Sequence, residues 1–471
     1  MAAPKRHAPD PTLRVENSPY TATLPCLPGR PYHGAEPGSG PLLPHRGAGV
    51  GERREGPGDP SLGRSARIDG AYRLVHLDAV SSPALRAYLD YAASTPMRPE
   101  AVAAMLPYLS DMFGNPSGGH AAARAAKTAL ESAREEIAGL LGAAPGEIVF
   151  TGGGTEGDNL AVEGAGRAAR AAGAGDGVVT TAFEHKGVLA ACDRLELEGF
   201  RVRRIAVDRD GIVDLGALGA ALDLDTVVVS VMLVNNEVGT VQPLDEVAAL
   251  VRERAPRAVL HTDAVQAVPW LDVAAAAAPA DLVAISAHKF GGPKGVGALV
   301  VRDGVAIAPL IEGGGQERGL RSGTSNVAGA VAMATALRIT TTERADVVAR
   351  VGALRDRLAA GLTEALPDCF FNGDAVRKVA GNCHIGFPGV EAEALLVALD
   401  RDGLCAAAGS SCSSGATEPS HVLEAMGIAR DEALASIRLS LGPETTDADV
   451  ATALEVIPAA VARLRPVGAV R

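Results

Sequence analysis

The chain has 471 residues, of which 47% are apolar and 21% charged, a balance typical of a globular protein with a substantial core. Its formal net charge of −12 argues against a general surface for nucleic acid or anionic membranes, and no apolar run approaches the roughly 20 residues of a membrane span. The six cysteines show no CxxC pair, no metal-ligand spacing and no disulfide framework. The composition therefore predicts a cytoplasmic protein without a metal site.

Residues 1–87 differ in composition from the rest of the chain. They hold 13 of the 30 prolines and carry more basic than acidic side chains, although the whole chain is acidic. They also lack periodicity and have too few apolar residues to offset the entropy of folding, so we expect a disordered Pro/Gly/Arg-rich extension. A cleaved targeting peptide is the alternative, but the segment has no apolar core of a secretion signal.

From residue 88 onward, short apolar runs rich in valine and isoleucine alternate with stretches long enough for helices. Such runs are typical of strands that are buried on both faces of a sheet. The predicted strands span residues 147–151, 177–181, 226–233, 258–263, 281–286 and 297–301. The helix predicted before the first strand has an apolar stripe made of Leu130, Ala133, Ile137 and Leu141. The alternation predicts an α/β fold with a mostly parallel sheet.

The pattern changes after about Asn326 to longer helices with few strands. This change predicts a second, smaller α/β domain at the C-terminal end of the chain. We therefore expect a large domain over residues 88–340, whose first residues could pack on the small domain, and a small domain over residues 341–471.

Polar residues follow the predicted strands, at the ends where an open parallel sheet binds its ligands. After the first strand, Gly152, Gly153 and Gly154 precede Thr155 and Asp158, which form a T-x-x-D helix-capping pattern. Backbone amides, a hydroxyl group and a helix N-terminus together can bind a phosphate. A glycine-rich turn between a strand and a helix is also common for structural reasons alone.

Polar residues also follow the later predicted strands, and their chemical groups complement one another. Each has a structural explanation when it is taken alone, such as capping the next helix. Taken together they supply the lysine for a Schiff base, the acid for a pyridine nitrogen and the aromatic base that pyridoxal phosphate (PLP) requires. A dinucleotide site fits less well, because the first glycine turn is not G-x-G-x-x-G. The residues are His185, Asn235, Asn236, Asp263, Gln266, Ser286, His288 and Lys289.

Cys412 lies in the stretch AAGSSCSSGATEPS, residues 407–420, whose small and polar side chains offer a core little to pack against. Buried structural cysteines rarely have such neighbours, whereas a mobile loop that carries a reactive group does. The structural alternative is a bystander thiol in a linker. We prefer the bystander interpretation for the other cysteines, which are Cys26, Cys192, Cys369, Cys383 and Cys405.

Ten motifs, in this order and spacing, resemble those of the cysteine desulfurases, a class V branch of the fold-type I PLP enzymes. The resemblance covers the chain from Tyr88 to about Pro466. It implies a large domain with a mostly parallel seven-stranded sheet and helices on both faces, followed by a smaller C-terminal α/β domain. The motifs are YLDYAASTP, FGNPSGGH, EIVFTGGGTEGDNLA, EHKGVL, VNNEVGTVQP, HTDAVQ, SAHKFGGPKGVGAL, GGGQERGLRSGT, GSSCSSG and SIRLSLG.

The resemblance implies cofactor-binding roles for the matching residues. Lys289 matches the Schiff-base lysine, Asp263 the partner of the pyridine nitrogen, and His185 the imidazole stacked on the ring. Gln266 matches the contact to the ring hydroxyl. The residues that match phosphate ligands are Gly154, Thr155, Ser286, His288 and, reaching across from the other subunit, Thr324.

The same resemblance implies the substrate site and the nucleophile. Asn236 matches an asparagine beside the cofactor and the substrate, and Arg438 matches the arginine that binds the substrate carboxylate with bidentate geometry. Cys412 matches the thiol that takes sulfur as a persulfide, and His185 is the candidate for helping to supply its thiolate.

The implied activity is conversion of L-cysteine to L-alanine by a homodimer. The long loop around Cys412 resembles that of the group whose sulfur goes to acceptor proteins of iron-sulfur cluster assembly or tRNA thiolation. One alternative is another class V PLP reaction, such as selenocysteine lysis or transamination. The other is a non-enzymatic sulfur carrier or metal-binding scaffold that uses Cys412 as a ligand.

Overall fold

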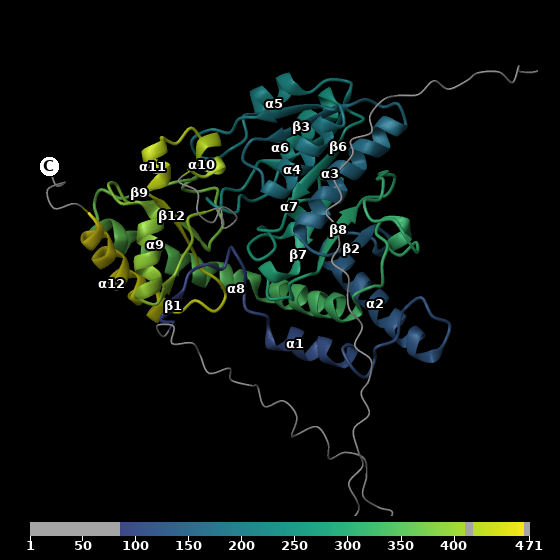
Figure 1. Ribbon diagram of the computed structural model, residues 1–471, viewed down its shortest axis with the longest axis horizontal. Helices are drawn as coiled ribbons and strands as arrows, with labels where there is room; N and C mark the ends of the chain where they lie inside the picture. The colour runs from purple at the N-terminus through teal and green to yellow at the C-terminus, as the bar shows by residue number, and fades with distance from the viewer. Residues whose placement is uncertain (1–84, 410–417, 466–471) are drawn as a thin grey trace, which may run out of the picture. The chain divides into compact units, whose positions relative to one another are not determined.

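A computed structural model describes residues 85–409 and 418–465 of the chain. Its main feature is a seven-stranded sheet with the strand order β2-β8-β7-β6-β5-β3-β4 (Figure 1). Strand β8 is antiparallel to both of its neighbours, and the other pairs are parallel, which confirms the predicted mostly parallel sheet. The strands are β2 (Ile148–Thr151), β3 (Gly177–Thr181), β4 (Arg201–Ile205), β5 (Thr226–Ser230), β6 (Val259–Asp263), β7 (Leu282–Ser286) and β8 (Gly297–Val301).

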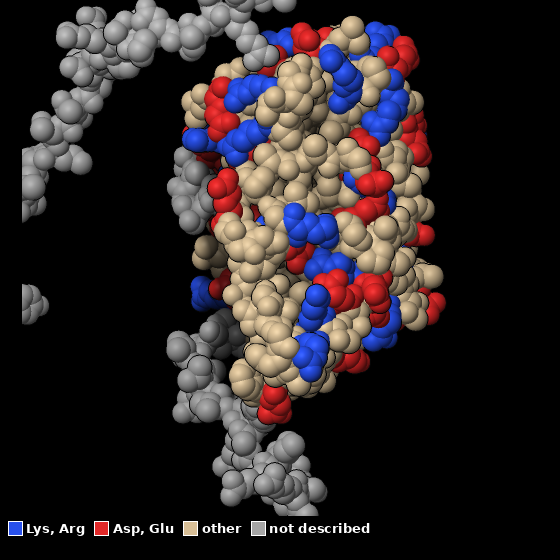
Figure 2. Space-filling model, turned by 90° about the vertical axis from the view of Figure 1, so that its right-hand side faces the viewer, with Lys and Arg blue, Asp and Glu red and all other residues tan. Residues whose placement is uncertain are grey.

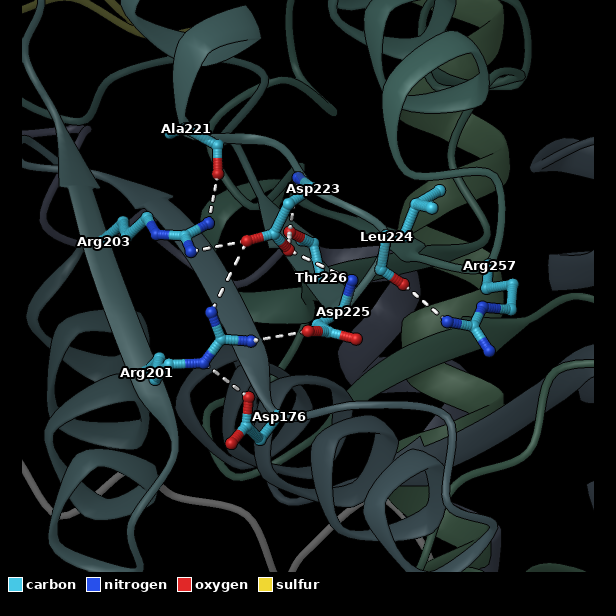
Figure 3. A network of polar contacts seen from close by, with 9 residues as sticks. All are labelled: Asp176, Arg201, Arg203, Ala221, Asp223, Leu224, Asp225, Thr226 and Arg257. Atoms are coloured by element: carbon cyan, nitrogen blue, oxygen red, sulfur yellow. Dashed lines mark hydrogen bonds and ion pairs between the residues drawn. The ribbon is translucent and has the colours of Figure 1, made fainter.

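Strand β4 was not predicted, because it lies at the edge of the sheet and carries three arginines in the sequence RVRRI. Figure 3 shows two of them held by carboxylates from the loops that precede β3 and β5. Arg201 Nε lies 2.7 Å from Asp176 Oδ1, and Arg203 Nη2 lies 2.6 Å from Asp223 Oδ2. Charged side chains on an edge strand discourage pairing with a further strand.

Both faces of the sheet are buried, as the continuous apolar runs predict. Alternate residues of one strand belong to different hydrophobic clusters: Ile148 and Phe150 pack with one cluster, and Val149 between them packs with the other. Helices α3 and α4 cover the second face, while α2, α6 and the first half of α8 cover the first. The apolar stripe of α2 is buried, as predicted.

The helices associated with this sheet vary widely in length. They are α1 (Pro99–Met105), α2 (Ala121–Leu140), α3 (Gly154–Ala171), α4 (Lys186–Leu197), α5 (Leu215–Ala221), α6 (Leu244–Arg254), α7 (Val273–Ala276) and α8 (Val327–Ala365), with 3-10 turns η1 (Leu106–Tyr108), η2 (Pro145–Glu147), η3 (Ala287–Lys289) and η4 (Glu317–Gly319). The predicted T-x-x-D cap is wrong, because α3 already begins at Gly154 and its N-cap, Gly153, makes no side-chain cap. Thr155 therefore lies inside the first turn.

A second, smaller set of elements forms its own hydrophobic cluster at the C-terminal end of the chain. It contains the sheet β12-β10-β9 and the short pair β1-β11, so the first described strand packs beside C-terminal elements. Its elements are β1 (Ala87–Tyr88), β9 (Phe370–Phe371), β10 (Asn382–Gly386), α9 (Ala392–Arg401), β11 (Leu404–Cys405), β12 (Ser436–Ser440) and α12 (Asp447–Leu464). Helices α10 (His421–Ala425) and α11 (Arg430–Leu434) pack in a separate cluster with Phe183 and Met232.

Helix α8 connects the two sets of elements, and Figure 1 shows it running between them. Most of its buried residues up to Leu337 pack in the cluster of the large sheet, and Val351, Leu354, Leu358 and Leu362 pack in the C-terminal cluster. The predicted boundary between residues 340 and 341 therefore falls within one continuous helix. Whether the two parts behave as separate domains stays a prediction.

Two surface properties complete the description. None of the helices among the described residues is long and apolar enough to cross a membrane. Figure 2 shows lysine and arginine side chains lying among aspartate and glutamate side chains over one face of the molecule, with uncharged atoms between them.

Candidate active site

A cavity of about 250 Å³ opens at the carboxyl ends of the parallel strands. Side chains from loops after five strands meet there, because the carboxyl ends of parallel strands share one edge of the sheet. Almost all of the predicted site residues line this one cavity. They are Gly154 and Thr155 after β2, His185 after β3, Asn236 after β5, Asp263 and Gln266 at β6, Ser286, His288 and Lys289 at β7, and Arg438 on β12.

His185 has both a structural and a cavity-lining position. Its Nδ1 accepts a hydrogen bond from the backbone N of Gly187 at 3.0 Å, which caps α4. Burial lowers the pKa of His185, while attraction to Asp263 raises it and Lys289 lowers it. The capping bond leaves Nε2 as the nitrogen that can carry the proton, so the ring is held in one orientation as a neutral imidazole.

Asp263 lies at the end of β6 and is 5% exposed. Its Oδ1 accepts from the backbone N of Val265 at 2.8 Å. Burial raises the pKa of Asp263, and interactions with His185 and Lys289 oppose that rise. A buried carboxylate at a cavity wall is best stabilised by a cationic partner, and a protonated pyridine nitrogen is such a partner.

Lys289 is anchored by the loop that follows β1. Its Nζ donates to the backbone oxygens of Ala92 at 2.7 Å and Ala93 at 2.9 Å. Gln266 Nε2 also donates to Ala92 O, at 2.9 Å. The motif YLDYAASTP thus builds one wall of the cavity and orients the lysine that is expected to react.

The amide-rich end of the cavity suits a phosphate. Gly154 and Thr155 lie at the N-terminus of α3, and Ser286 and His288 face them from the end of β7. A Cβ atom at Gly154 would lie 2.7 Å from Val265 Cγ2, so a larger residue would crowd this turn. Burial lowers the pKa of His288 to about 4, which makes it a neutral hydrogen-bonding group at ordinary pH.

Arg438 on β12 is 2% exposed and lies at the opposite side of the cavity. Its Nη1 donates to Asn236 O at 2.8 Å and to Gly409 O at 3.2 Å, and its Nη2 donates to Asp90 Oδ1 at 2.8 Å. Its Nε has no hydrogen-bond partner among the described residues. The guanidinium is therefore fixed in place by the protein before any ligand arrives.

Several buried polar atoms around the cavity lack a partner within the described part of the chain. A buried polar atom without a hydrogen bond costs about 1–3 kcal/mol, so a ligand that completes these bonds would be favoured. A molecule with a phosphate, a ring hydroxyl and a ring nitrogen matches the donor and acceptor pattern, and the cavity residues therefore fit PLP. The atoms are Asp158 Oδ1, Asn236 Oδ1, Glu237 Oε1, His421 Nδ1 and Arg438 Nε.

Two predicted residues, Thr324 and Asn235, do not line the cavity. Thr324 is exposed and does not contribute to the cavity within one chain. Cys412 lies outside the described residues. The chain on either side of its segment is anchored near the cavity: Gly409 lines the cavity, and Ser420 Oγ donates to Glu237 Oε2.

Comparison with known proteins identifies the family. The model of the aminotransferase class-V family matches residues 87–452. A cysteine desulfurase from Nostoc sp. is 43% identical over 378 residues, which cover 80% of this chain and 93% of the relative. An IscS-like cysteine desulfurase from Mycobacterium tuberculosis is 46% identical over 384 residues, which cover 80% of this chain and 97% of the relative. The chain belongs to the cysteine desulfurases of the aminotransferase class-V family.

Solved structures agree with this assignment. A NifS-like protein superimposes with a TM-score of 0.76 at 34% identity, covering 80% of this chain and 100% of that protein. DndA from Streptomyces lividans superimposes with a TM-score of 0.63 at 36% identity, covering 75% and 99% respectively. The class-V aminotransferases are PLP-dependent enzymes, which agrees with the fit of the cavity to that cofactor.

The cavity has further lining residues that the sequence did not single out as site residues. One is Asp158, which was interpreted from the sequence as part of a helix cap. Asn235, which was predicted together with Asn236, does not line the cavity. Asn235 is instead structural, because its Oδ1 accepts from the backbone N of Glu237 at 2.8 Å. Periodicity gave no signal for the remaining lining residues, which are Ala92, Ala93, Lys186, Glu237, Val265, Gly409 and His421.

Proposed function

We propose that this protein converts L-cysteine to L-alanine with PLP and takes the sulfur onto Cys412 as a persulfide. The observation that carries the proposal is one cavity that brings Lys289, Asp263 and Arg438 together beside Gly409, shortly before Cys412 in the chain. The names of the relatives support the same substrate.

The cavity residues assign places to the parts of the cofactor. Lys289 would hold PLP covalently through Nζ, Asp263 would face the ring nitrogen, and Gln266 the ring hydroxyl. His185 would cover the ring, while Gly154, Thr155, Ser286 and His288 would receive the phosphate. When bound, PLP supplies an electron sink that makes loss of the Cα proton and cleavage at Cβ feasible.

The protein's own groups then handle the substrate. Arg438 and Asn236 would bind the carboxylate of L-cysteine and orient Cα toward Lys289. Lys289 Nζ would move the Cα proton, because its tether beside Ala92 and Ala93 keeps it at the cavity wall. The Nε2–H of the neutral His185 would donate a hydrogen bond to a nearby thiolate and so favour the thiolate over the thiol.

The sulfur transfer balances without an added oxidant or reductant. The thiolate of Cys412 attacks Sγ of the substrate and forms an S–S bond while the Cβ–Sγ bond breaks. The electron pair of that bond stays with Cβ, which takes up a proton and becomes the methyl group of alanine. The persulfide would then pass to acceptor proteins of iron-sulfur cluster assembly or tRNA thiolation in the cytoplasm, without direct nucleic-acid contact.

A homodimer is part of the proposal, because Thr324 cannot serve the cavity of its own chain. Exposed apolar side chains on α1, η1 and the following turn support a second copy as the partner, since contiguous apolar surface usually marks an interface. They are Val102 (38% exposed), Leu106 (42%), Leu109 (59%), Met112 (37%) and Phe113 (77%). The partner would then place its Thr324 on the phosphate.

The deciding experiment is incubation of the holoenzyme with L-cysteine and a thiol reductant, with alanine and sulfide both quantified. We expect equal amounts of both, and a persulfide mapped to Cys412 by mass spectrometry when the reductant is omitted. Alanine formed by a Cys412→Ser variant at the full rate would favour a lyase of another kind. Consumption of 2-oxo acids would favour an aminotransferase, and a protein without PLP would favour a carrier or scaffold.

A further inference from the structure

Buried acids gather at and behind the inner wall of the cavity, although the proposed chemistry needs only Asp263 there. Asp158 on α3 is 1% exposed and Glu184, after β3, is 0% exposed. A carboxylate oxygen of Asp158, one of Asp263 and a ring nitrogen of His185 lie within 4.8 Å of one another. Asp158 thus lies next to the group that would face the ring nitrogen of PLP.

Asp158 is backed by a second pair of buried side chains. His261 Nε2 on β6 lies 3.5 Å from Asp158 Oδ1, and both side chains are at most 1% exposed. On its other side, His261 Nδ1 lies 2.9 Å from Ser230 Oγ of the neighbouring strand β5. His261 and Asp263 are two residues apart on one strand, so their side chains point to the same face, where α3 packs.

The positions of the protons in this cluster follow from charge and burial. Two carboxylates this close and shielded from water cannot both be ionised at low cost. Burial raises the pKa of Asp158 well above its usual range, and the charge of Asp263 raises it further. Burial also lowers the pKa of His261 to about 3, so this histidine is neutral. Burial and mutual repulsion therefore favour a single proton on the pair of aspartates.

The geometry determines which aspartate holds that proton. Asp263 receives a backbone hydrogen bond from Val265 and interacts favourably with His185 and the cationic Lys289. Asp158 Oδ1 receives no hydrogen bond from the described residues. The ionised form is therefore better stabilised at Asp263, and the proton belongs on Asp158.

We propose that Asp158, backed by His261 and Ser230, is a positioning residue whose carboxylic acid proton keeps Asp263 ionised toward the ring nitrogen of PLP. This inference rests on the proposed function. The titratable groups that face Asp158 are His261 and Asp263 from β6, and Glu184 and His185 from the turn between β3 and α4; Lys289, which follows β7, acts on Asp263. Glu184 is held separately by Thr181 Oγ1 at 2.7 Å and the backbone N of Met232 at 2.8 Å.

The test follows PLP retention by the holoenzyme, through its visible absorption, as the pH is lowered. Protonation of Asp263 removes the partner of the ring nitrogen, so the fraction of protein that retains PLP should fall at low pH. This fall, the acid limb of the retention curve, follows the protonation of Asp263. Asp158→Leu removes the donor, and we expect this limb to move upward by about one pH unit, with PLP bound about tenfold more weakly at neutral pH. Asp158→Asn keeps a neutral donor and should leave the limb where it is in the wild type.

The matched control is Glu163→Gln, another buried carboxylate on α3, which pairs with Arg167 at 2.6 Å away from the cavity. It should not move the limb. A downward shift in Asp158→Asn would show that Asp158 is ionised and would overturn the inference, even if Asp158→Leu fails to fold. Unchanged behaviour of Asp158→Leu would overturn it as well. A wild-type protein that does not bind PLP would overturn the proposed function and, with it, this inference.

Discussion

Arg438 Nη2 lies 2.8 Å from Asp90 Oδ1, so the arginine proposed to bind the substrate carboxylate already holds a carboxylate of its own chain. The Arg438 side chain is buried, with an exposed fraction of 2%. Asp90 orients the guanidinium, but its negative charge also reduces the attraction of Arg438 for an anionic substrate. Asp90 therefore improves the orientation of Arg438 but weakens the attraction of Arg438 for the substrate carboxylate.

We expect Asp90→Asn and Asp90→Ala to separate these two effects. Asparagine keeps an acceptor oxygen and removes the charge, so KM for L-cysteine should fall a few-fold. Alanine removes the acceptor too, and KM should rise because Arg438 is no longer oriented. Arg438→Lys should raise KM by about tenfold or more, since the bidentate contact is lost. Steady-state kinetics would measure all three, and equal KM values for the two Asp90 variants would contradict this account.

Lys289→Ala should lose the visible absorption of bound PLP and nearly all activity. Among the described residues, the lysines that line this cavity are Lys289 and Lys186, the first residue of α4. Lys289 Nζ is held at the wall by two backbone carbonyls. Lys186→Ala is therefore the matched control and should keep the band. A Lys289→Ala protein that retains the band after gel filtration would refute the role of this lysine.

The exposed apolar patch on η1 and the turn after it predicts a dimer that weakens when the patch is charged. Leu109→Glu combined with Phe113→Glu should raise the dimer dissociation constant at least about tenfold, because each buried apolar side chain contributes about 1.5–3 kcal/mol. Light scattering over a dilution series measures the change, with PLP retention followed in parallel. Leu197→Glu, at an exposed leucine on α4, is the control. An active wild-type monomer would contradict the shared site.

The sequence predicted the buried parts of the sheet better than its edge. The runs at β3 and β8 have the predicted bounds, because continuous apolar stretches are typical of strands covered on both faces. Strand β4 escaped detection, because its arginines are stabilised by Asp176 and Asp223 from other loops. Ion pairs between segments that are distant in the sequence leave no pattern in the sequence of the strand itself.

The site was predictable where residues follow strands and unpredictable where folding brings distant segments together. Asp263 and Lys289 each follow an apolar run directly. Asp90 and Arg438 form a hydrogen bond although they are 348 residues apart in the sequence. His421 and the backbone oxygen of Glu184 do so at a separation of 237 residues. A single sequence without those contacts gives no reason to prefer either residue.

Removal of residues 1–86 should leave PLP binding and specific activity largely unchanged. The first described strand begins at Ala87, and Leu89 after it is fully buried in the C-terminal cluster, so the cut spares both. Among the described residues, the cut removes the hydrogen bond from Arg86 N to Gly403 O at 2.9 Å and the exposed ion pair of Arg86 with Glu455, which is worth about 0–1 kcal/mol. Activity and thermal unfolding of the shortened protein test this. Loss of PLP or insolubility would show that the extension is needed for folding.

Glu184 should make the protein less stable as the pH rises through the neutral range. Burial raises the pKa of Glu184 from 4.5 to about 8, although Thr181 and the backbone of Met232 stabilise its charged form. Below pH 4.5 the glutamate is protonated in both the folded and the unfolded chain. Between pH 4.5 and 8 the unfolded chain ionises while the folded chain stays protonated, so the free energy of unfolding decreases by up to about 1.4 kcal/mol per pH unit.

Glu184→Gln is nearly isosteric and does not titrate, so it should lose less stability than the wild type over the same pH range. Chemical unfolding of both proteins at pH 5, 6, 7 and 8 measures the difference, which should grow with pH and level off above about pH 8. The control is Glu163→Gln, a buried carboxylate whose charge is balanced by Arg167. Parallel stability curves for wild type and Glu184→Gln would show that Glu184 is ionised in the folded protein, with Thr181 and Met232 N outweighing the cost of burial.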